Sequence, residues 1–465
     1  MKGLGAFLST SLAFSATGAL GTSLQPAKRA SAEPVTIKGN AFWQGDKRFY
    51  IRGVDYQPGG SSKVDDPIAN PKECKRDIAK FKDLKINTVR VYAIDNSKDH
   101  TECMSALADA GIYLALDVNT PKYSINRASP KASYNDNYLQ NVFATVDEFV
   151  KYDNTLLFFS GNEVINDATN TKSAPYVKAV TRDVRNYLKS RDYRRVPVGY
   201  SAADVEENRA QMAAYMNCGS EESRSDFFAF NDYSWCDPSS FTQSGWDQKV
   251  KNFSDYSIPL FLSEFGCVKN TREFNEVKAL YSTKMSSVFS GGLVYEYSNE
   301  PDNPNYGLVK INGNNLKELE DYKALKTALA GAQDPEGDGG YKKSGKSSKC
   351  PATSKYWSIE DNMIPTIPEP AQKFLDQGAG KGKGLSGPGS QTSGTPSEDT
   401  EDGGNEQTTE SPSESDSGSS SGSSDGSSTS TAAAASLHIP EMSIAPMLCA
   451  LVVLASSMVG AAALF

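Results

Sequence analysis

The chain has 465 residues, a net charge of −9 and a pI near 5.1. This acidic balance excludes the basic surface typical of nucleic-acid-binding proteins, so we expect no nucleic-acid partner. The sequence contains two histidines, His100 and His438, which leaves almost no material for a histidine metal site or for Ser-His-Asp catalysis. We therefore expect neither a metal ion nor another cofactor.

Both ends of the sequence have the composition of targeting segments. Residues 1–21 combine Lys2 with an apolar run and small residues, which is typical of a secretory signal peptide. Residues 436–465 place a short spacer before a mostly apolar run, the layout of a GPI-attachment signal that is removed during processing. An ordinary tail-anchoring helix is the alternative. We expect a secreted protein, GPI-anchored to the outer face of the plasma membrane or transferred to the cell wall.

Two polar regions precede this C-terminal segment. Residues 387–435 are nearly all Ser, Gly, Thr, Asp, Glu and Pro, and such a stretch cannot bury enough apolar surface to fold, so we predict a disordered stalk. Residues 331–386 are predicted to be an extension that Cys350 ties back to the main domain. Six of the seven cysteines lie before the predicted GPI signal, which allows up to three disulfides in fifteen pairings. Asn252 begins an Asn-Phe-Ser sequon and is the expected N-glycosylation site.

Between residues 35 and 330, short apolar runs alternate with segments of helical periodicity. The runs predict strands at residues 50–56, 88–94, 113–118, 156–161, 196–201, 227–233, 259–265 and 292–297. The segments 71–84 and 174–189 carry apolar residues at helical spacing. Eight such units predict a (β/α)8 barrel as the catalytic domain, with residues 36–48 as a hairpin closing its bottom. A doubly wound open sheet is the alternative, but no glycine-rich phosphate turn follows the first strand.

Two glutamates follow the fourth and seventh predicted strands. Glu163 ends the run SGNE, and Glu264 lies in the run SEFG. Because reacting groups of a barrel lie at the C-terminal ends of its strands, we expect the two carboxylates to face each other across the barrel mouth. Retaining glycosidases use such a pair as acid/base and nucleophile, and Asn162 suits a hydrogen bond to the sugar 2-hydroxyl. Taken singly, each glutamate could instead be a solvated loop charge.

Several blocks of sequence together resemble one known family. The runs IRGVDYQPGG (51–60), VRVY (89–92), SGNE (160–163), LSEFGC (262–267) and FSGGLVYEY (289–297) resemble glycoside hydrolase family 72, the fungal GPI-anchored β-1,3-glucanosyltransferases. The resemblance spans about residues 35–326 and then Cys350. It implies Glu163 as acid/base and Glu264 as nucleophile in a retaining double displacement. That reaction cleaves a β-1,3-glucan internally and transfers the new reducing end to the non-reducing end of another β-1,3-glucan.

The resemblance also implies further residues and bonds. It pairs Cys74 with Cys103, Cys218 with Cys350, and Cys236 with Cys267, and it identifies the loop from Asn119 to Arg127 as the donor-side loop. The substrate contacts expected from it and from the strand ends are Gln57, Tyr92, Asp117, Asn119, Ser124, Asn126, Arg127, Asn162, Asp204, Arg209, Tyr233, Tyr295 and Tyr297. Tyr295 and Tyr297 would point to the same side of the predicted strand, so the sequence does not tell which of them contacts the substrate.

The same residues leave other functions open. A retaining endo-β-1,3-glucanase would use the same two carboxylates with water as acceptor. A catalytically inactive wall glycoprotein and a carbohydrate-binding module are further alternatives, although neither explains two strand-end carboxylates. The chain lacks the cysteine-rich carbohydrate-binding module found in part of the family and so resembles its shorter subgroup. We expect a monomer whose partners are β-1,3-glucan donor and acceptor chains.

Overall fold

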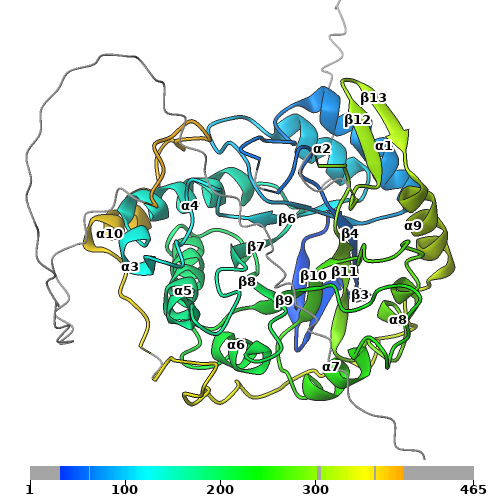
Figure 1. Cartoon of the computed structure of the whole chain (residues 1–465). Coiled ribbons are helices and arrows are strands. Elements are labelled where there is room, and N and C mark those ends of the chain that lie inside the picture. The colour runs from blue at the N-terminus through cyan, green and yellow to red at the C-terminus, as the bar shows by residue number, and fades with distance from the viewer. Residues whose placement is uncertain (1–31, 62, 301–304, 361–362, 392–465) are drawn as a thin grey trace, which may run out of the picture. The chain divides into compact units, whose positions relative to one another are not determined.

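The computed structural model describes residues 32–391, apart from 62, 301–304 and 361–362. A closed barrel of eight parallel strands forms its centre (Figure 1). In order around the barrel these are β4 (Ile51–Asp55), β5 (Thr88–Val91), β6 (Tyr113–Asp117), β7 (Thr155–Asn162), β8 (Val198–Ala203), β9 (Phe227–Asp232), β10 (Leu260–Phe265) and β11 (Phe289–Val294), which pairs with β4. The predicted (β/α)8 fold is confirmed, and the doubly wound alternative is wrong.

The eighth strand is the one whose predicted position was wrong. It spans Phe289–Val294 rather than residues 292–297, so the two candidate tyrosines lie beyond its end. Gly291 has a φ of 87°, and a Cβ there would stand 2.1 Å from the carbonyl oxygen of Ile51 on β4. A glycine pair disfavours a strand by propensity, but here the close approach of β11 to β4 requires it.

Helices cover the outside of the barrel. They are α1 (Pro71–Leu84), α2 (Thr101–Asp109), α3 (Pro130–Ser133), α4 (Asp136–Phe149), α5 (Ala174–Ser190), α6 (Arg209–Met216), α7 (Trp246–Asn252), α8 (Glu276–Leu280) and α9 (Glu320–Gly331), with a 3₁₀ turn η1 (Thr171–Ser173) before α5. Helix α1 shows why the spacing of apolar residues predicted this helix. Asn70 caps it by accepting from the N–H of Lys72, Pro71 occupies the first turn, and Ile78 and Phe81 are buried against the barrel.

A small antiparallel sheet closes the bottom of the barrel. It consists of β1 (Val35–Lys38), β2 (Ala41–Gln44) and β3 (Lys47–Phe49). The ring of Phe42 lies 6.3 Å from that of Phe227 and 5.9 Å from that of Phe261, at the starts of β9 and β10. The predicted hairpin is confirmed at this position. The structure adds a third strand, β3, to it. A separate hairpin, β12 (Val309–Asn312) and β13 (Asn315–Glu318), precedes α9.

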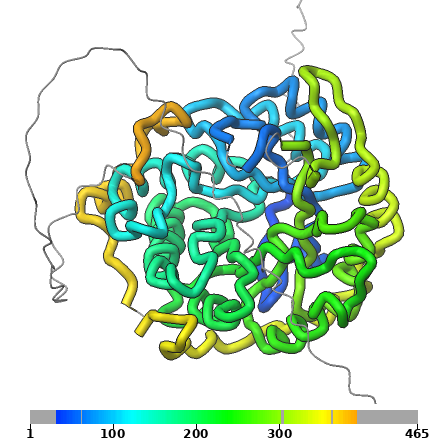
Figure 2. Tube along the Cα trace, in the orientation of Figure 1, coloured from blue at the N-terminus to red at the C-terminus, as the bar shows by residue number. Residues whose placement is uncertain are grey.

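The C-terminal extension runs around the outside of the barrel (Figure 2). Trp357 packs against Tyr215, with 5.3 Å between ring centroids, and α10 (Glu369–Gln377) lies against α4 and α5. The described residues continue to Gln391, five residues past the predicted boundary between extension and stalk at residue 386. Backbone hydrogen bonds to the barrel, such as that from Ser390 to Lys122, order residues 387–391 despite their polar composition. The predicted segments 1–21, 392–435 and 436–465 lie outside the described residues.

Three disulfides reinforce this arrangement. Cys74–Cys103 joins α1 to α2, Cys218–Cys350 ties the extension to the end of α6, and Cys236–Cys267 joins the loops after β9 and β10. These are the pairings that the family resemblance implied, and they are confirmed. Asn252 is exposed at the end of α7. Within the described ranges, no helix has both the length and the apolar character needed to span a membrane.

One buried acid makes stability depend on pH. Burial raises the pKa of Glu276 on α8 to about 8, and nearby Asp237 acts in the same direction. Because the folded protein holds this proton more tightly than the unfolded chain does, the contribution to stability is present at low pH and is lost as pH rises towards 8. Glu276→Gln should therefore raise Tm at pH 8 by more than at pH 5, as measured by scanning calorimetry. An equal shift at both pH values would exclude Glu276 as the titrating group.

Candidate active site

Glu264 lies near the end of β10 and is almost fully enclosed. Its Oε1 accepts a hydrogen bond of 2.8 Å from the phenol of Tyr92 and faces the guanidinium of Arg90 at 3.3 Å. Its Oε2 accepts from the phenol of Tyr233 at 2.7 Å. Both carboxylate oxygens are therefore held by donors from β5 or its C-terminal end and from the loop after β9. The side chain is fixed in one orientation below the barrel mouth.

The environment of Glu264 acts on its pKa in two directions. Burial raises the pKa, and the neighbouring charge of Glu163 adds to that effect. Arg90 and the two phenol donors favour the ionised carboxylate and lower the pKa. Arg90 is the largest of these opposing influences. Burial has the larger effect and raises the pKa of Glu264 to about 7, while the three donors keep it from rising further.

Glu163 follows the last residue of β7 and is half-buried. Its Oε1 accepts a 2.8 Å hydrogen bond from Nδ2 of Asn231. Its backbone has a φ of 46°, a left-handed conformation that is uncommon for a residue with a side chain. The N–H of Glu163 donates to the carbonyl of Ser201 at 2.9 Å, and its carbonyl accepts from Arg127 at 2.7 Å. Such a conformation persists where the surroundings fix it, and it often marks a functional site.

A network of neutral side chains holds the carboxylate of Glu163. Asn231, at the end of β9, pairs in register with Glu264 on β10 while its amide reaches Glu163. The same amide lies 3.3 Å from Oδ1 of Asn162, which also accepts from the Ser201 hydroxyl at 2.7 Å. Sequence reasoning placed Asn162 here but missed Asn231. The available signal was a polar side chain at the end of an otherwise apolar strand.

Arg90 forms the floor of the site. Its side chain is fully buried, and its Nε lies 2.9 Å from Oδ2 of Asp117. The guanidinium also stacks 4.2 Å from the ring of Tyr92 and 4.5 Å from that of Phe159. Asp117, predicted as a substrate contact, therefore uses its carboxylate mainly to hold Arg90. Arg90 was missed, although a charged residue inside an apolar strand was visible in the sequence.

A cavity of about 260 Å³ adjoins these residues on the β6–β7 side of the mouth. Its lining includes Ser61, Tyr92, Asp117, Asn119, Thr120, Pro121, Ser124, Ile125, Arg127 and Asn162. The side-chain N–H₂ of Asn119 is buried without a partner among the described residues, which leaves a donor available to a ligand. The donor-side loop thus contributes Asn119, Ser124 and Arg127 to the cavity. Asn126 instead accepts from the N–H of Ala128 and stabilises the loop itself.

Three tyrosines form an aromatic cluster next to Glu264. The ring of Tyr295 lies 6.4 Å from that of Tyr233 and 5.2 Å from that of Tyr306. Tyr306 was missed because it lies in a loop outside the predicted strands. Aromatic faces of this kind stack against sugar rings, which suits a carbohydrate ligand.

Tyr297 does not belong to this cluster, so its prediction as a substrate contact is wrong. It is fully buried, its phenol donates to Asp77 of α1 at 2.9 Å, and its ring packs 5.0 Å from Phe81. The prediction assumed that residues 295 and 297 belong to one strand. Since β11 ends at Val294, their side chains follow different directions.

Two other predicted contacts are engaged with the protein. Gln57 is buried, accepts from the N–H groups of Tyr92 and Ala93, and donates to the carbonyl of Asp65, so it positions loops rather than facing the cavity. Asp204 forms an ion pair with Arg209 and a second with Lys249 at 2.7 Å.

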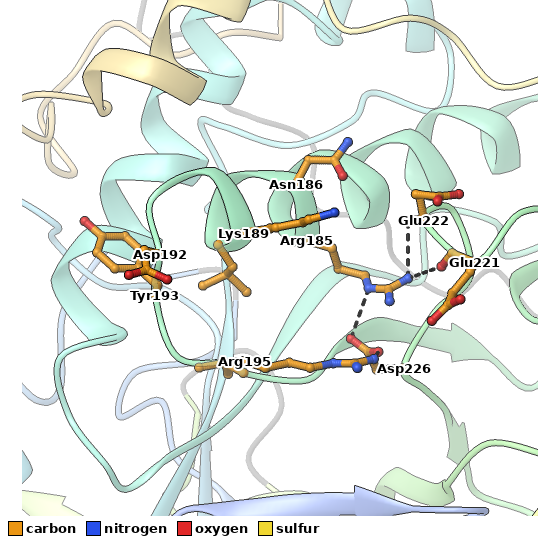
Figure 3. Close-up of a pocket in the computed structure, with 11 residues that line it drawn as sticks. Arg185, Asn186, Lys189, Asp192, Tyr193, Arg195, Glu221, Glu222 and Asp226 are labelled. Carbon is orange, nitrogen blue, oxygen red and sulfur yellow. Dashed lines mark hydrogen bonds and ion pairs between the residues drawn. The ribbon is translucent and has the colours of Figure 1, made fainter.

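A larger cavity lies near the opposite end of the barrel strands, between the end of α5 and the loop before β9 (Figure 3). It has a volume of about 490 Å³. Its arginines are engaged: Arg195 lies 2.7 Å from Asp226, and Arg185 pairs with the same carboxylate and donates to the carbonyls of Glu221 and Glu222. The protein itself therefore occupies the two guanidinium groups of this cavity. Among the described residues, no cluster of three or more His, Cys, Asp or Glu side chains is placed to hold a metal ion.

Comparison with known proteins agrees with this geometry. The family model described as "Glucanosyltransferase", glycoside hydrolase family 72, matches residues 24–333. The chain belongs to this family. It is 66% identical over 360 residues to 1,3-beta-glucanosyltransferase gel1 of Aspergillus fumigatus, covering 77% of this chain and 79% of that protein. It is 54% identical to 1,3-beta-glucanosyltransferase GAS5 of Saccharomyces cerevisiae, with 76% and 74% coverage.

A solved structure of a family relative is also similar. Saccharomyces cerevisiae Gas2p, carrying a Glu-to-Gln substitution and in complex with laminaritetraose and laminaripentaose, superposes with a TM-score of 0.68. It is 38% identical to this chain, and the match covers 73% of this chain and 76% of the Gas2p chain. The barrel assignment therefore agrees with an experimentally solved relative.

The phenol donors to Glu264 lead to a prediction about pH dependence. Each stabilises the ionised carboxylate, so Tyr92→Phe or Tyr233→Phe should raise the pKa of Glu264. The acid limb of the kcat/KM profile should move to higher pH by roughly half a unit to one unit in each variant. Tyr306→Phe is the matched control, because it removes a phenol of the same cluster, and its acid limb should keep the wild-type position. Unmoved acid limbs in both test variants would contradict this role.

Proposed function

We propose that the protein is a β-1,3-glucanosyltransferase that uses Glu163 as acid/base and Glu264 as nucleophile. The observation that carries this proposal is the position of Glu163 and Glu264 at the C-terminal ends of β7 and β10. Asn231 on β9 donates to Glu163 and is the strand-register partner of Glu264. The names of the relatives support the substrate class, since gel1 and GAS5 are called 1,3-beta-glucanosyltransferases. The laminari-oligosaccharides bound to Gas2p point to the same glucan.

The reaction proceeds by two displacements. In the first, Glu264 attacks the anomeric carbon of an internal glucosyl unit while Glu163 protonates the departing glycosidic oxygen. The C–O bond to the reducing-end portion breaks, and a covalent glycosyl ester forms on Glu264. In the second, Glu163 removes the proton from an acceptor hydroxyl, which displaces Glu264 and restores both carboxyl groups. Two inversions retain the β configuration.

The surrounding residues support this chemistry. Tyr92 and Tyr233 keep Glu264 oriented, and their bonds weaken as negative charge leaves that carboxylate in the transition state. Asn162 precedes the proposed acid/base and lines the adjoining cavity, which supports a hydrogen bond from it to the sugar 2-hydroxyl. The cavity formed with the donor-side loop is suited to one part of the glucan chain, and the tyrosine cluster beside Glu264 to another.

Location and attachment follow from the sequence ends and the family. The predicted signal peptide and GPI signal support a secreted protein held at the outer face of the plasma membrane by a lipid anchor. That location would place the enzyme beside its glucan donor and acceptor chains. Asn252 is proposed as a glycosylation site because its exposed side chain begins a sequon.

Transfer and hydrolysis give different product lengths, which supplies the first test. Incubation with one defined laminari-oligosaccharide should yield products both longer and shorter than the substrate, separated by high-performance anion-exchange chromatography. By NMR the new linkage should be β, because the configuration is retained, and 1,3, because the resemblance implies attack by the 3-hydroxyl of the acceptor's non-reducing end. Products exclusively shorter than the substrate would identify a hydrolase instead.

Substitution of the two carboxylates supplies the second test. Glu163→Gln and Glu264→Gln each remove a group that acts in the transition state, so kcat should fall by roughly a thousandfold or more. Glu206→Gln and Glu207→Gln, on an exposed turn after β8, are the matched controls and should keep wild-type kcat. Activity within tenfold of wild type in either test variant would overturn the assignment of that residue.

A further inference from the structure

We propose that residues 378–391, which we call the strap, hold the donor-side loop in the conformation that binds substrate. Sequence composition assigned the end of this segment to the stalk, and no chemical role was attached to it. The strap follows α10 and lies beside α4 (orange in Figure 1). This inference rests on the proposed function, because it concerns substrate binding at the same site.

The first half of the strap is anchored to the barrel helices. The N–H of Ala379 donates to the phenol of Tyr187 on α5 at 2.8 Å. Gln140 of α4 donates to the carbonyls of Ala379 and Lys381 at 2.9 and 3.0 Å. The N–H of Gly384 donates to Oδ1 of Asn96, in the loop after β5, at 2.9 Å. These bonds fix the strap to elements that belong to the core fold.

The second half of the strap binds the donor-side loop directly. The buried Ser390 donates its N–H to the carbonyl of Lys122 at 3.0 Å, and its own carbonyl accepts from Asn135 at 3.1 Å. The side-chain amide of Gln391 donates to the carbonyl of Pro121 at 2.8 Å and to the hydroxyl of Ser124 at 2.5 Å. Pro121 and Ser124 both line the cavity beside the catalytic residues.

Close packing supports the same contact. A Cβ at Gly387 would lie 2.2 Å from the phenol oxygen of Tyr123, so the strap backbone passes close to the hydroxyl end of that buried side chain. Only glycine allows this approach. The strap therefore covers the outer side of the loop while the inner side of the same loop faces the cavity.

The loop needs external support because it has little regular structure of its own. The donor-side loop contains one short bridge, Thr120 with Tyr123, and the single-turn helix α3 is the regular element between the loop and α4. A loop held before the ligand arrives loses less conformational entropy on binding. The strap should therefore lower KM for the donor without changing the chemical step.

The experiment uses the full chain with two strap variants and one control. Gln391→Ala removes the side-chain bonds to the loop, and Gly387→Leu forces the strap off Tyr123. Gln377→Ala is the control, because it makes the same chemical change at an exposed position on α10, before the strap. For Gln391→Ala we expect KM for a laminari-oligosaccharide to rise roughly three- to tenfold, the loss from one or two hydrogen bonds, with kcat within about twofold. Gly387→Leu should raise KM at least as much, and the control should match wild type.

Two further measurements separate the strap from the proposed function. Hydrogen–deuterium exchange of residues 119–135 should be faster in both strap variants than in wild type and the control. Calorimetric titration of a laminari-oligosaccharide into the Glu163→Gln background should show the same rise in Kd, whether or not the products are longer than the substrate. Unchanged exchange and unchanged KM in Gln391→Ala would overturn the proposal, as would a fall in kcat at constant KM. A hydrolytic product pattern with raised KM would instead overturn transfer and leave the strap's role in place.

Discussion

The buried guanidinium of Arg90 is the constraint on which the site depends. A charge with no exposure to solvent is stable only when it is paired, and Arg90 lies within ion-pair distance of both Asp117 and Glu264. Asp55, on β4, adds a third carboxyl whose pKa burial raises well above its usual range while Arg90 opposes that shift. Glu264, the proposed nucleophile, is therefore part of a buried charge cluster, and Arg90 helps to fix its position.

The two proposed catalytic carboxyl groups lie in different environments. Glu264 contacts a cation and two phenols, whereas Glu163 contacts the neutral amide of Asn231. Ser201 and Ser263 belong to the neutral network around Asn231. Their hydroxyls lie 2.8 Å apart, and both donate to Oδ1 of Asn231. The two carboxyl groups thus differ in their hydrogen-bond partners. An acid/base and a nucleophile need this kind of difference.

Sequence reasoning succeeds where the fold dictates position. In a barrel of eight parallel strands, the residues at the C-terminal strand ends must share one rim, and this rule alone places Glu163 and Glu264 together.

Sequence reasoning fails where the partners of a residue come from elsewhere in the chain. Arg90 was passed over because strand periodicity does not tell which buried charge faces which carboxylate. Tyr297 was misassigned because alternation holds only inside a strand, and the chain leaves β11 before reaching it. The end of the strap was taken for stalk because a Gly- and Ser-rich composition does not reveal backbone bonds to a surface.

The strap and the acid/base are connected through one loop, and the nature of that connection explains why the strap should act on binding. Arg127, in the donor-side loop, donates to the carbonyl of Glu163 at 2.7 Å, so loop and catalytic residue are in contact. The N–H of Glu163, however, is held by Ser201, and its carboxylate by Asn231, both on strands of the barrel. A looser loop would weaken the bond from Arg127 to Glu163. The bonds to Ser201 and Asn231, which orient the carboxylate, would remain. The barrel therefore fixes the chemistry, while the loop and its strap fix the shape of the donor cavity.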